Sequence, residues 1–206
     1  LPEVFLEDMS YEKYVDMSLN MPLLFIQQNS KYIKADGKTF NDFMGGNIKV
    51  IENKKPTLKD FETHLATIFT EVRLKNYIEI RSIDACEWSC HCAGPAFYVG
   101  LLYGNLEEAY DVINNWNKLD VMNAYLEAPK KGLATMINNK SILEWSKILL
   151  NLSKKGLQKR SIKNKSGKDE SIFLKNIENT LLNKKTKAEK IIEDFNKKKR
   201  IDFFYE

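Results

Sequence analysis

The sequence predicts an α+β fold, with antiparallel strands backed by helices in the first half and a mainly helical second half. Two observations support this prediction. Residues 71–81 alternate between polar and apolar side chains, as the residues of a β-strand do. From residue 106 onward, apolar residues recur at helical spacing, and no linker rich in Pro, Gly or Ser interrupts the chain.

The composition is that of an ordinary globular protein. The chain has 206 residues, 43% hydrophobic and 29% charged, with a net charge of +4. No apolar run reaches the ~20 residues that a bilayer crossing needs, and the acidic first residues do not resemble a secretory signal. Three cysteines, an odd number, favour a reducing compartment over a disulfide framework. We therefore expect a cytoplasmic protein that does not enter a membrane.

Three helices and a hairpin are expected before residue 70. Ser10, Thr39 and Thr57 suit helix N-caps, and they predict helices over 10–21, 39–46 and 57–69. Strands 23–26 and 31–34 form a hairpin around the Asn29-Ser30 turn. The third helix places five apolar residues at helical spacing, and these are expected to be core: Leu58, Phe61, Leu65, Ile68 and Phe69.

Residues 71–81 are predicted to form one strand. Its apolar face, which includes Val72 and Ile78, is expected to pack against the core. The opposite face carries charged groups and a phenol, spaced roughly 6.5 Å apart along the strand. These polar residues are Glu71, Arg73, Lys75, Tyr77, Glu79 and Arg81.

The second half reads as a series of helices after a loop over 82–92. A buried helix is expected over 96–103, between Gly94-Pro95 and Gly104. Further helices are predicted over 106–119, over 141–158 from a capping box, over 167–182, and from 186 to about 195 from a second capping box.

The charged strand face is the leading candidate site. Glu79 is a suitable oxygen ligand for Mg²⁺, although one carboxylate needs partners from elsewhere. Arg81 two residues on could hold a phosphoryl group, and Arg73 and Lys75 would extend the positive track. The alternative is an exposed ladder of ion pairs, which would contribute little.

Three other features have alternative interpretations. Cys86, Cys90 and Cys92, with a histidine between the last two, are too crowded for an ordinary zinc site, so buried thiols are favoured over a redox-sensitive pair. Trp88 would either wall a substrate pocket or cover the core. The Lys-rich stretch 184–200 suits a solvated helix face better than a nucleic-acid surface, and the sequence lacks a P-loop motif.

Residues 70–104 resemble a known enzyme family. The runs TEVRLKNYIEIRSIDACEW and AGPAFYVGLLYG resemble the glutamate–cysteine ligases of plants and proteobacteria, and further matches extend in order over nearly the whole chain. The resemblance implies that residues 1–206 are the C-terminal part of one glutamine-synthetase-like catalytic domain, with the sheet and active-site strand in 1–104 and the helical portion in 105–206. It also implies a longer protein, which agrees with the first residue being Leu.

The resemblance assigns a role to each residue of the strand. It implies that Glu79 is a metal ligand and that Arg81 contacts the transferring phosphate. Arg73 and Lys75 would belong to the nucleotide or glutamate site. Tyr77, Asp84 and Trp88 would belong to the substrate pocket. Asp84 and Trp88 keep their positions in the family pattern, but the family's glycines and proline are replaced around them, which leaves the loop conformation and the amine substrate open.

The implied function is ATP- and Mg²⁺-dependent joining of the γ-carboxylate of glutamate to cysteine, the first step of glutathione synthesis. The expected partners are small molecules (glutamate, cysteine and ATP), with a homodimer left open. The alternatives are a ligase that uses another amine or serves another thiol, and a non-catalytic basic helical module that binds nucleic acid. We expect the 206-residue chain alone to be inactive, because half of the implied site would lie outside it.

Overall fold

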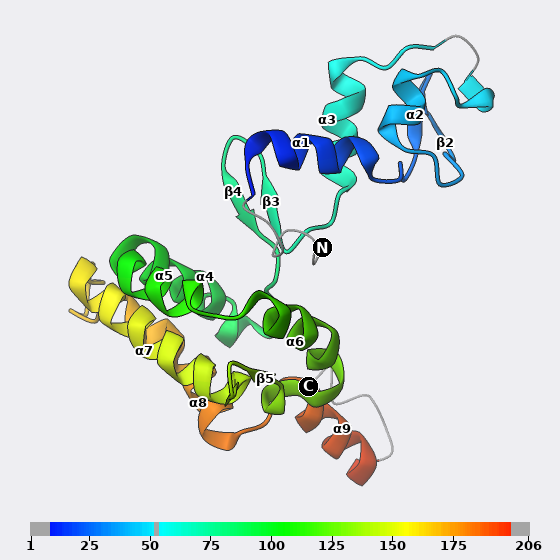
Figure 1. The fold of residues 1–206 in the computed structure, drawn as a ribbon. Coiled ribbons are helices and arrows are strands. Elements are labelled where there is room, and N and C mark those ends of the chain that lie inside the picture. The colour runs from blue at the N-terminus through cyan, green and yellow to red at the C-terminus, as the bar shows by residue number, and fades with distance from the viewer. Residues whose placement is uncertain (1–8, 52–53, 199–206) are drawn as a thin grey trace. The chain divides into compact units, whose positions relative to one another are not determined.

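The computed structural model describes residues 9–51 and 54–198, and these form two compact units, Leu1–Ile83 and Asp84–Glu206 (Figure 1). Short antiparallel hairpins lie among helices in the first unit, and the second unit is mainly helical. The predicted α+β class is therefore confirmed. The division of one catalytic domain at residue 104 stays a prediction.

The first unit contains the three helices predicted from their N-caps and the hairpin predicted around the Asn29-Ser30 turn. The helices are α1 (Tyr11–Asn20), α2 (Phe40–Met44) and α3 (Leu58–Thr67), and the strands are β1 (Ile26–Gln28) and β2 (Lys31–Ile33). Both Thr39 and Thr57 form capping boxes with an aspartate three residues on. The turn residues Asn29 and Ser30 have φ of 48° and 60°, which suits the tight turn between β1 and β2.

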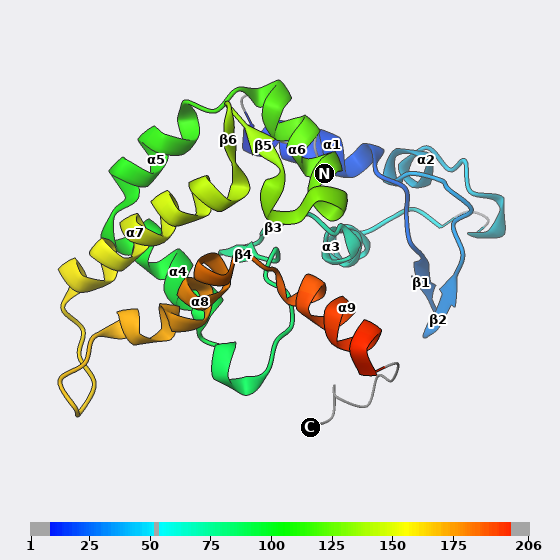
Figure 2. The same ribbon diagram turned by 90° about the horizontal axis from the view of Figure 1, so that it is seen from below.

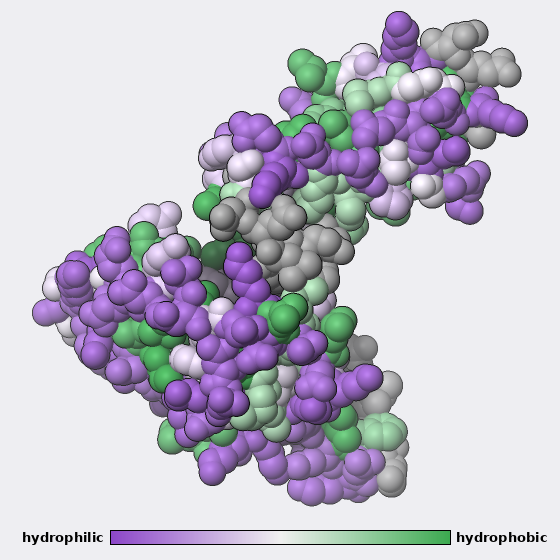
Figure 3. Space-filling view, in the orientation of Figure 1, coloured by the Kyte–Doolittle hydropathy of each residue, from purple (hydrophilic) through white to green (hydrophobic). Residues whose placement is uncertain are grey.

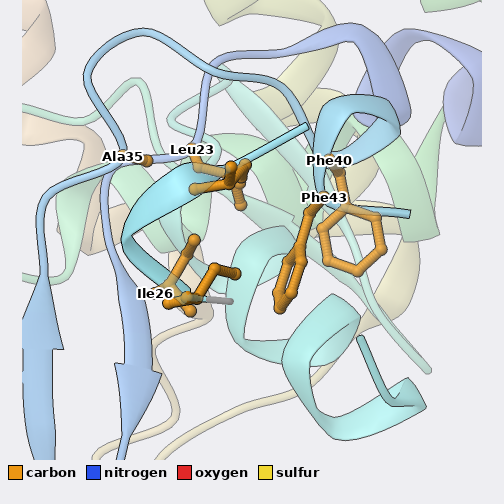
Figure 4. Packing of buried hydrophobic residues seen from close by; sticks show 7 residues of the cluster. Leu23, Ile26, Ala35, Phe40 and Phe43 are labelled. Carbon is orange, nitrogen blue, oxygen red and sulfur yellow. The ribbon is translucent and has the colours of Figure 1, made fainter. Parts of the chain in front are cut away.

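The core of this unit lies around α2. Figure 4 shows its apolar side chains gathered together, with the rings of Phe40 and Phe43 next to each other. The centres of these two rings are 5.8 Å apart. The buried cluster consists of Leu23, Ile26, Ala35, Phe40, Phe43, Ile48 and Ile51. The third predicted helix contributes less to the core than expected, because Leu58 is 83% exposed and Phe69 is 66% exposed. These two core predictions are wrong.

His64 of α3 is buried among these rings. Its ring stacks on that of Phe40 with ring centres 5.4 Å apart, and its Nε2 lies 2.7 Å from the carbonyl oxygen of Ser18. A carbonyl only accepts hydrogen bonds, so Nε2 carries the proton, and the buried Nδ1 has no hydrogen-bond partner. Burial lowers the pKa of His64 below its ordinary 6.5, against the smaller raising effect of the Ser18 carbonyl.

The single strand predicted over 71–81 is wrong. Residues 72–80 form a hairpin of β3 (Val72–Leu74) and β4 (Ile78–Ile80), in which Arg73 lies opposite Glu79. The turn has three residues, an odd number, so side chains of one sequence parity still share one face. A single strand and this hairpin therefore produce the same alternation of polar and apolar residues, and the sequence pattern cannot distinguish them.

The two faces of the hairpin also differ from the expectation. Val72 is 51% exposed and Ile78 is 68% exposed, whereas Arg73 on the charged face is 5% exposed. The predicted packed apolar face is therefore wrong for Val72 and Ile78. The long stem of an arginine can be buried when its guanidinium has partners, and this allows the charged face to pack inward.

The second unit is built from helices with one short hairpin. Figure 2 shows α4, α7 and α8 side by side. The elements are α4 (Ala93–Val99), which continues as a π-helical turn (Gly100–Gly104), α5 (Leu106–Asn114), α6 (Lys118–Lys131), β5 (Met136–Ile137), β6 (Lys140–Ser141), α7 (Ile142–Arg160), α8 (Lys175–Asn183) and α9 (Lys187–Lys198).

Most helix starts in this unit agree with the sequence, with three differences. The helix predicted over 106–119 ends at Asn114, and α6, which Asn117 caps through the amides of Leu119 and Asp120, was not predicted. The helix predicted from 167 begins as a 3₁₀ segment (Glu170–Leu174) before α8. The β5–β6 hairpin was not predicted, since its strands have only two residues each.

Small residues allow α7 to pack closely on α4 and its π-helical continuation. Ser153 of α7 donates a hydrogen bond to the carbonyl of Phe97 at 2.8 Å. A Cβ added at Gly156 would overlap the backbone carbonyl of Gly100, and one added at Gly104 would overlap the backbone of Gly156. The buried apolar cluster around this contact includes Ala96, Leu150, Leu157, Leu174 and Leu181.

Polar residues predominate on the face drawn in Figure 3, where apolar residues form small separate patches. Among the described residues, no helix combines the length and the apolar character needed to span a bilayer.

Replacing Gly156 by Ala should destabilise the second unit by about 1–3 kcal/mol, because the new Cβ has no space against Gly100. Urea unfolding followed by circular dichroism measures the effect. In an uncrowded helix the same change would stabilise, so the sign of the effect is diagnostic. Asn151→Ala, at an exposed position of α7, is the control and should change stability by less than about 0.5 kcal/mol. A stabilising Gly156→Ala would contradict the close contact.

Stability should fall as the pH drops below 6.5. The folded state depresses the pKa of His64, so this contribution is complete above the unfolded value of 6.5 and is lost as pH falls towards the folded value. The loss should reach at most about 1.4 kcal/mol per pH unit within that interval. Urea unfolding at pH 7.5 and 5.5 measures it.

His64→Gln should remove this pH dependence, while His91→Gln, which changes the exposed second histidine, should keep it. Equal losses in wild type and His64→Gln would assign the effect to other groups.

Candidate functional site

The charged face of the β3–β4 hairpin gathers three cations around one carboxylate. Glu79 Oε1 lies 2.8 Å from Arg81 Nη1, and Oε2 lies 3.5 Å from Arg73 Nη1 and 3.8 Å from Lys75 Nζ. The hairpin positions them directly, since Arg73 is the cross-strand partner of Glu79 and Arg81 follows it by two residues on the same face. We call Arg73, Lys75, Glu79 and Arg81 the hairpin cluster.

Arg73 is the buried member of the hairpin cluster. Its Nε donates a hydrogen bond to the carbonyl of Ile68 at 3.3 Å, and its Nη2 is buried without a hydrogen-bond partner. A guanidinium has five N–H donors, and a donor left unsatisfied in the interior is costly. The unpartnered Nη2 therefore favours an acceptor, such as an anion, at this position.

Phe69 is a member of the site that the sequence analysis assigned to the core. The guanidinium carbons of Arg73 and Arg81 lie 5.8 Å and 5.6 Å from the centre of its ring. An aromatic face attracts cations, so Phe69 helps hold the two arginines near each other. Its place beside a strand of alternating charges was the only sequence signal for this role.

Tyr77 lies at the turn of the same hairpin. Its carbonyl accepts a hydrogen bond from the amide of Lys75 at 2.9 Å, and the Lys75 ammonium lies 6.0 Å from the centre of its ring. Its side chain is 56% exposed. The structure therefore brings five predicted site residues into one hairpin, four of them through ion pairs and Tyr77 through its ring.

Asp84 and Trp88 belong to the second unit and are both exposed. Trp88 is 88% exposed and stacks on His91 with ring centres 5.9 Å apart. The alternative in which Trp88 covers the core is therefore wrong. Its role in a substrate pocket, like that of Asp84, stays a prediction.

The expectation of buried thiols is also wrong. Cys86 and Cys90 form a disulfide, and Cys92 is free and exposed. The three residues between the paired cysteines include part of a 3₁₀ turn (Trp88–Cys90), which brings the two side chains back toward each other.

A cavity of about 460 Å³ in the first unit does not include the hairpin cluster. Its lining is mainly apolar and includes Val15, Leu19, Met44 and Leu58. It lacks the convergent polar groups that fix a charged substrate, so the hairpin cluster is the better candidate.

The hairpin cluster fits an anion better than a metal ion. The cluster carries a formal charge of +2 (3 − 1), which Glu71, opposite Arg81, lowers to +1, and guanidinium groups match the oxygens of phosphate. Both oxygens of Glu79 already face cations, and within the described residues no group of three or more His, Cys, Asp or Glu side chains could hold a metal. These residues by themselves do not fit Mg²⁺.

The chain is similar to known ligases over nearly its whole length. A sequence model of the family described as glutamate-cysteine ligase family 2 matches residues 1–199. The chloroplastic glutamate–cysteine ligase of Solanum lycopersicum is 37% identical over 195 residues, which are 94% of this chain and 36% of that protein. Ligase A of Oryza sativa subsp. indica is 37% identical over 194 residues, 93% of this chain and 38% of that protein.

The enzyme of Arabidopsis thaliana is 35% identical over 198 residues, which are 95% of this chain and 37% of that protein. This chain thus spans less than two fifths of the length of these curated relatives. The expected cytoplasmic location is wrong, because the matched relatives are chloroplastic enzymes by name. Cysteine number and the character of the first residues describe only this stretch, so they were insufficient evidence for a compartment.

Replacing Arg73 by Met should weaken the binding of tripolyphosphate about ten- to hundredfold, because a buried charged donor is lost. Stability should fall by about 1–3 kcal/mol, since Met preserves the packed stem but loses the bond to the Ile68 carbonyl and the pair with Glu79. Calorimetric titration at low salt measures affinity, and urea unfolding measures stability.

Arg160→Met is the matched control, because it removes another ion-paired arginine, the partner of Glu170 at 3.1 Å. It should leave tripolyphosphate affinity within about twofold. Unchanged affinity in Arg73→Met would exclude Arg73 from the anion site.

Proposed function

Because the chain belongs to glutamate–cysteine ligase family 2, we propose that it supplies the phosphate-binding part of an ATP-dependent ligase that joins glutamate to cysteine. The observation that carries this proposal is the convergence of Arg73, Lys75 and Arg81 on one carboxylate, with the Arg73 Nη2 buried and unpartnered. These are the groups that a transferring phosphoryl group requires.

In the proposed reaction, ATP phosphorylates the γ-carboxylate of glutamate and releases ADP. The amine of cysteine then attacks the acyl phosphate, which forms γ-glutamylcysteine and releases phosphate. Both steps concentrate negative charge on phosphoryl oxygens, so fixed cations lower their barriers. A protein contributes mainly positioning and charge to such a transfer.

Each cation has a distinct part in the proposal. Arg73 is fixed by burial and by the Ile68 carbonyl, so it anchors a phosphate oxygen with little loss of conformational freedom. Arg81 is more exposed and contacts the transferring phosphoryl group. Lys75, near the turn, adds charge for the nucleotide or for glutamate.

ATP supplies the phosphoryl group when it is bound, and Mg²⁺ is the metal expected with it. Because the described residues do not by themselves fit Mg²⁺, no step here depends on the metal. The assignment of Glu79 as a metal ligand remains a prediction that requires carboxylates outside this chain. Tyr77, Asp84 and Trp88 are likewise proposed, on the resemblance alone, to contact the substrates.

Neither alternative function gains support. Another amine substrate, or a ligase that serves another thiol, would use the same cations, so profiling product formation with different amino acids is the test. A nucleic-acid-binding module would need free cations on the C-terminal helices. In and beside α9, Lys187 is paired with Glu87 and Lys185 with Glu193 at 2.6 Å, which is the mixed charge of a solvated helix face. Filter binding of DNA and RNA at two salt concentrations would detect such a module.

Arg81→Ala should lower kcat by at least about a hundredfold in a polypeptide that spans the length of the curated relatives, because it removes a charge that acts in the transition state. The assay is γ-glutamylcysteine formation from ATP, glutamate and cysteine. Arg160→Ala, which removes an ion-paired arginine of the second unit, is the control and should retain activity. Activity within a few-fold of wild type in Arg81→Ala, with the fold intact by circular dichroism, would remove Arg81 from the mechanism.

A further inference from the structure

We propose, on the basis of the phosphate-binding role above, that Glu79 is an internal stand-in for the phosphate of the ligand. Its carboxylate lies at the centre of the hairpin cluster and keeps the three cations in place. A polyphosphate binds by taking over these cations, so Glu79 competes with the ligand that it prepares the site for. Glu79 is thus a positioning residue for the anion site.

The contacts of both carboxylate oxygens support this inference. Oε1 faces Arg81, and Oε2 is shared by Arg73 and Lys75. Carboxylate and phosphate oxygens are recognised by the same guanidinium donors. The side chain of Glu79 is 29% exposed, and that of Arg81 is 32% exposed. A ligand can therefore reach these two groups from solvent, and it contacts Arg73 once the Glu79 carboxylate releases the Arg73 guanidinium.

The charges explain why a carboxylate is needed here. Without Glu79, three like charges would face one another across two short strands, and one of them is on a buried side chain. With Glu79, the cluster keeps a net positive charge that still attracts an anion. Glu79 also competes with the ligand, which binds only when Glu79 releases the three cations. The apparent affinity for the ligand is therefore reduced by the fraction of molecules in which Glu79 has released them.

This inference predicts that removing the negative charge of Glu79 increases the affinity of the protein for a polyphosphate. Glu79→Gln keeps the size and an acceptor oxygen but removes the negative charge. In the presence of EDTA it should bind tripolyphosphate about tenfold more tightly than wild type, the effect of removing one charge a few ångströms from the anion. A metal ligand would also make Glu79→Gln lose affinity for the magnesium complex of tripolyphosphate, a loss that the stand-in role does not predict.

The experiment is a calorimetric titration of the 206-residue protein with tripolyphosphate in EDTA at pH 7.5 and low salt. Wild type, Glu79→Gln, Arg73→Met and Glu62→Gln are compared, each checked for fold by circular dichroism. Glu62 is an exposed carboxylate of α3, so Glu62→Gln controls for the change in net charge. It should match wild type within about twofold.

The outcomes separate the two proposals. Tighter binding by Glu79→Gln, lost on Arg73→Met, supports the stand-in role. Equal or weaker binding by Glu79→Gln, with Arg73→Met still defective, overturns that role and leaves the phosphate site standing. Binding that is unaffected by Arg73→Met, or no binding by any variant, overturns the phosphate site itself.

A second measurement covers the case in which Glu79→Gln does not fold. The ¹³C resonance of the Glu79 side-chain carboxyl is followed in the wild-type protein during the tripolyphosphate titration. Loss of its cationic partners should shift this resonance in step with saturation, and the Glu62 carboxyl should not move. An unmoved Glu79 resonance at saturation would overturn the stand-in role.

Discussion

The carboxylate of Glu79 holds the hairpin cluster together. The Arg73 guanidinium is buried, and a buried charge persists only with a partner. Glu79 is that partner, and it also draws Arg81 and Lys75 to the same point. The hairpin is only three residues long on each side, too short to be stable by backbone pairing alone. Its charge arrangement, the Phe69 ring beneath two guanidiniums and the bond from Arg73 to Ile68 therefore define both its local structure and its chemistry.

Local signals in the sequence were sufficient for most of the helices. Capping boxes begin three of them, at Thr39, Thr57 and Ser141. In each box the N-cap side chain and an acidic side chain three residues on accept hydrogen bonds from backbone amides of the helix start, so the motif needs no distant partner. Helix α6 was missed although Asn117 is a good N-cap, and it contains Pro129, a residue that ordinarily argues against a helix interior. The β5–β6 hairpin was missed because two-residue strands carry no periodicity.

The convergence of charged residues in 71–81 was predicted, but their packing was not. Arg73, Lys75 and Arg81 do meet at Glu79, and phosphate recognition by them stays a proposal. Which face is buried was predicted incorrectly, because burial depends on what lies next to the hairpin. Phe69 and Ile68, at the end of α3, make that neighbourhood. The disulfide between Cys86 and Cys90 was missed for a similar reason, since the local turn, rather than the number of cysteines, decides which thiols meet.

The turn over residues 75–77 places a limit on insertions and deletions. Its odd length leaves Arg73 and Glu79 on one face, as cross-strand partners. If one residue were inserted or deleted there while the β3 pairing shifted to fit, the side chains of β4 would be displaced by one position, and Glu79 and Arg81 would point to the face opposite Arg73. A change of two residues would restore the arrangement. A shift of register at this turn therefore preserves the cluster only when the change in length is even, whereas a longer turn that leaves the pairing unchanged keeps Arg73 opposite Glu79.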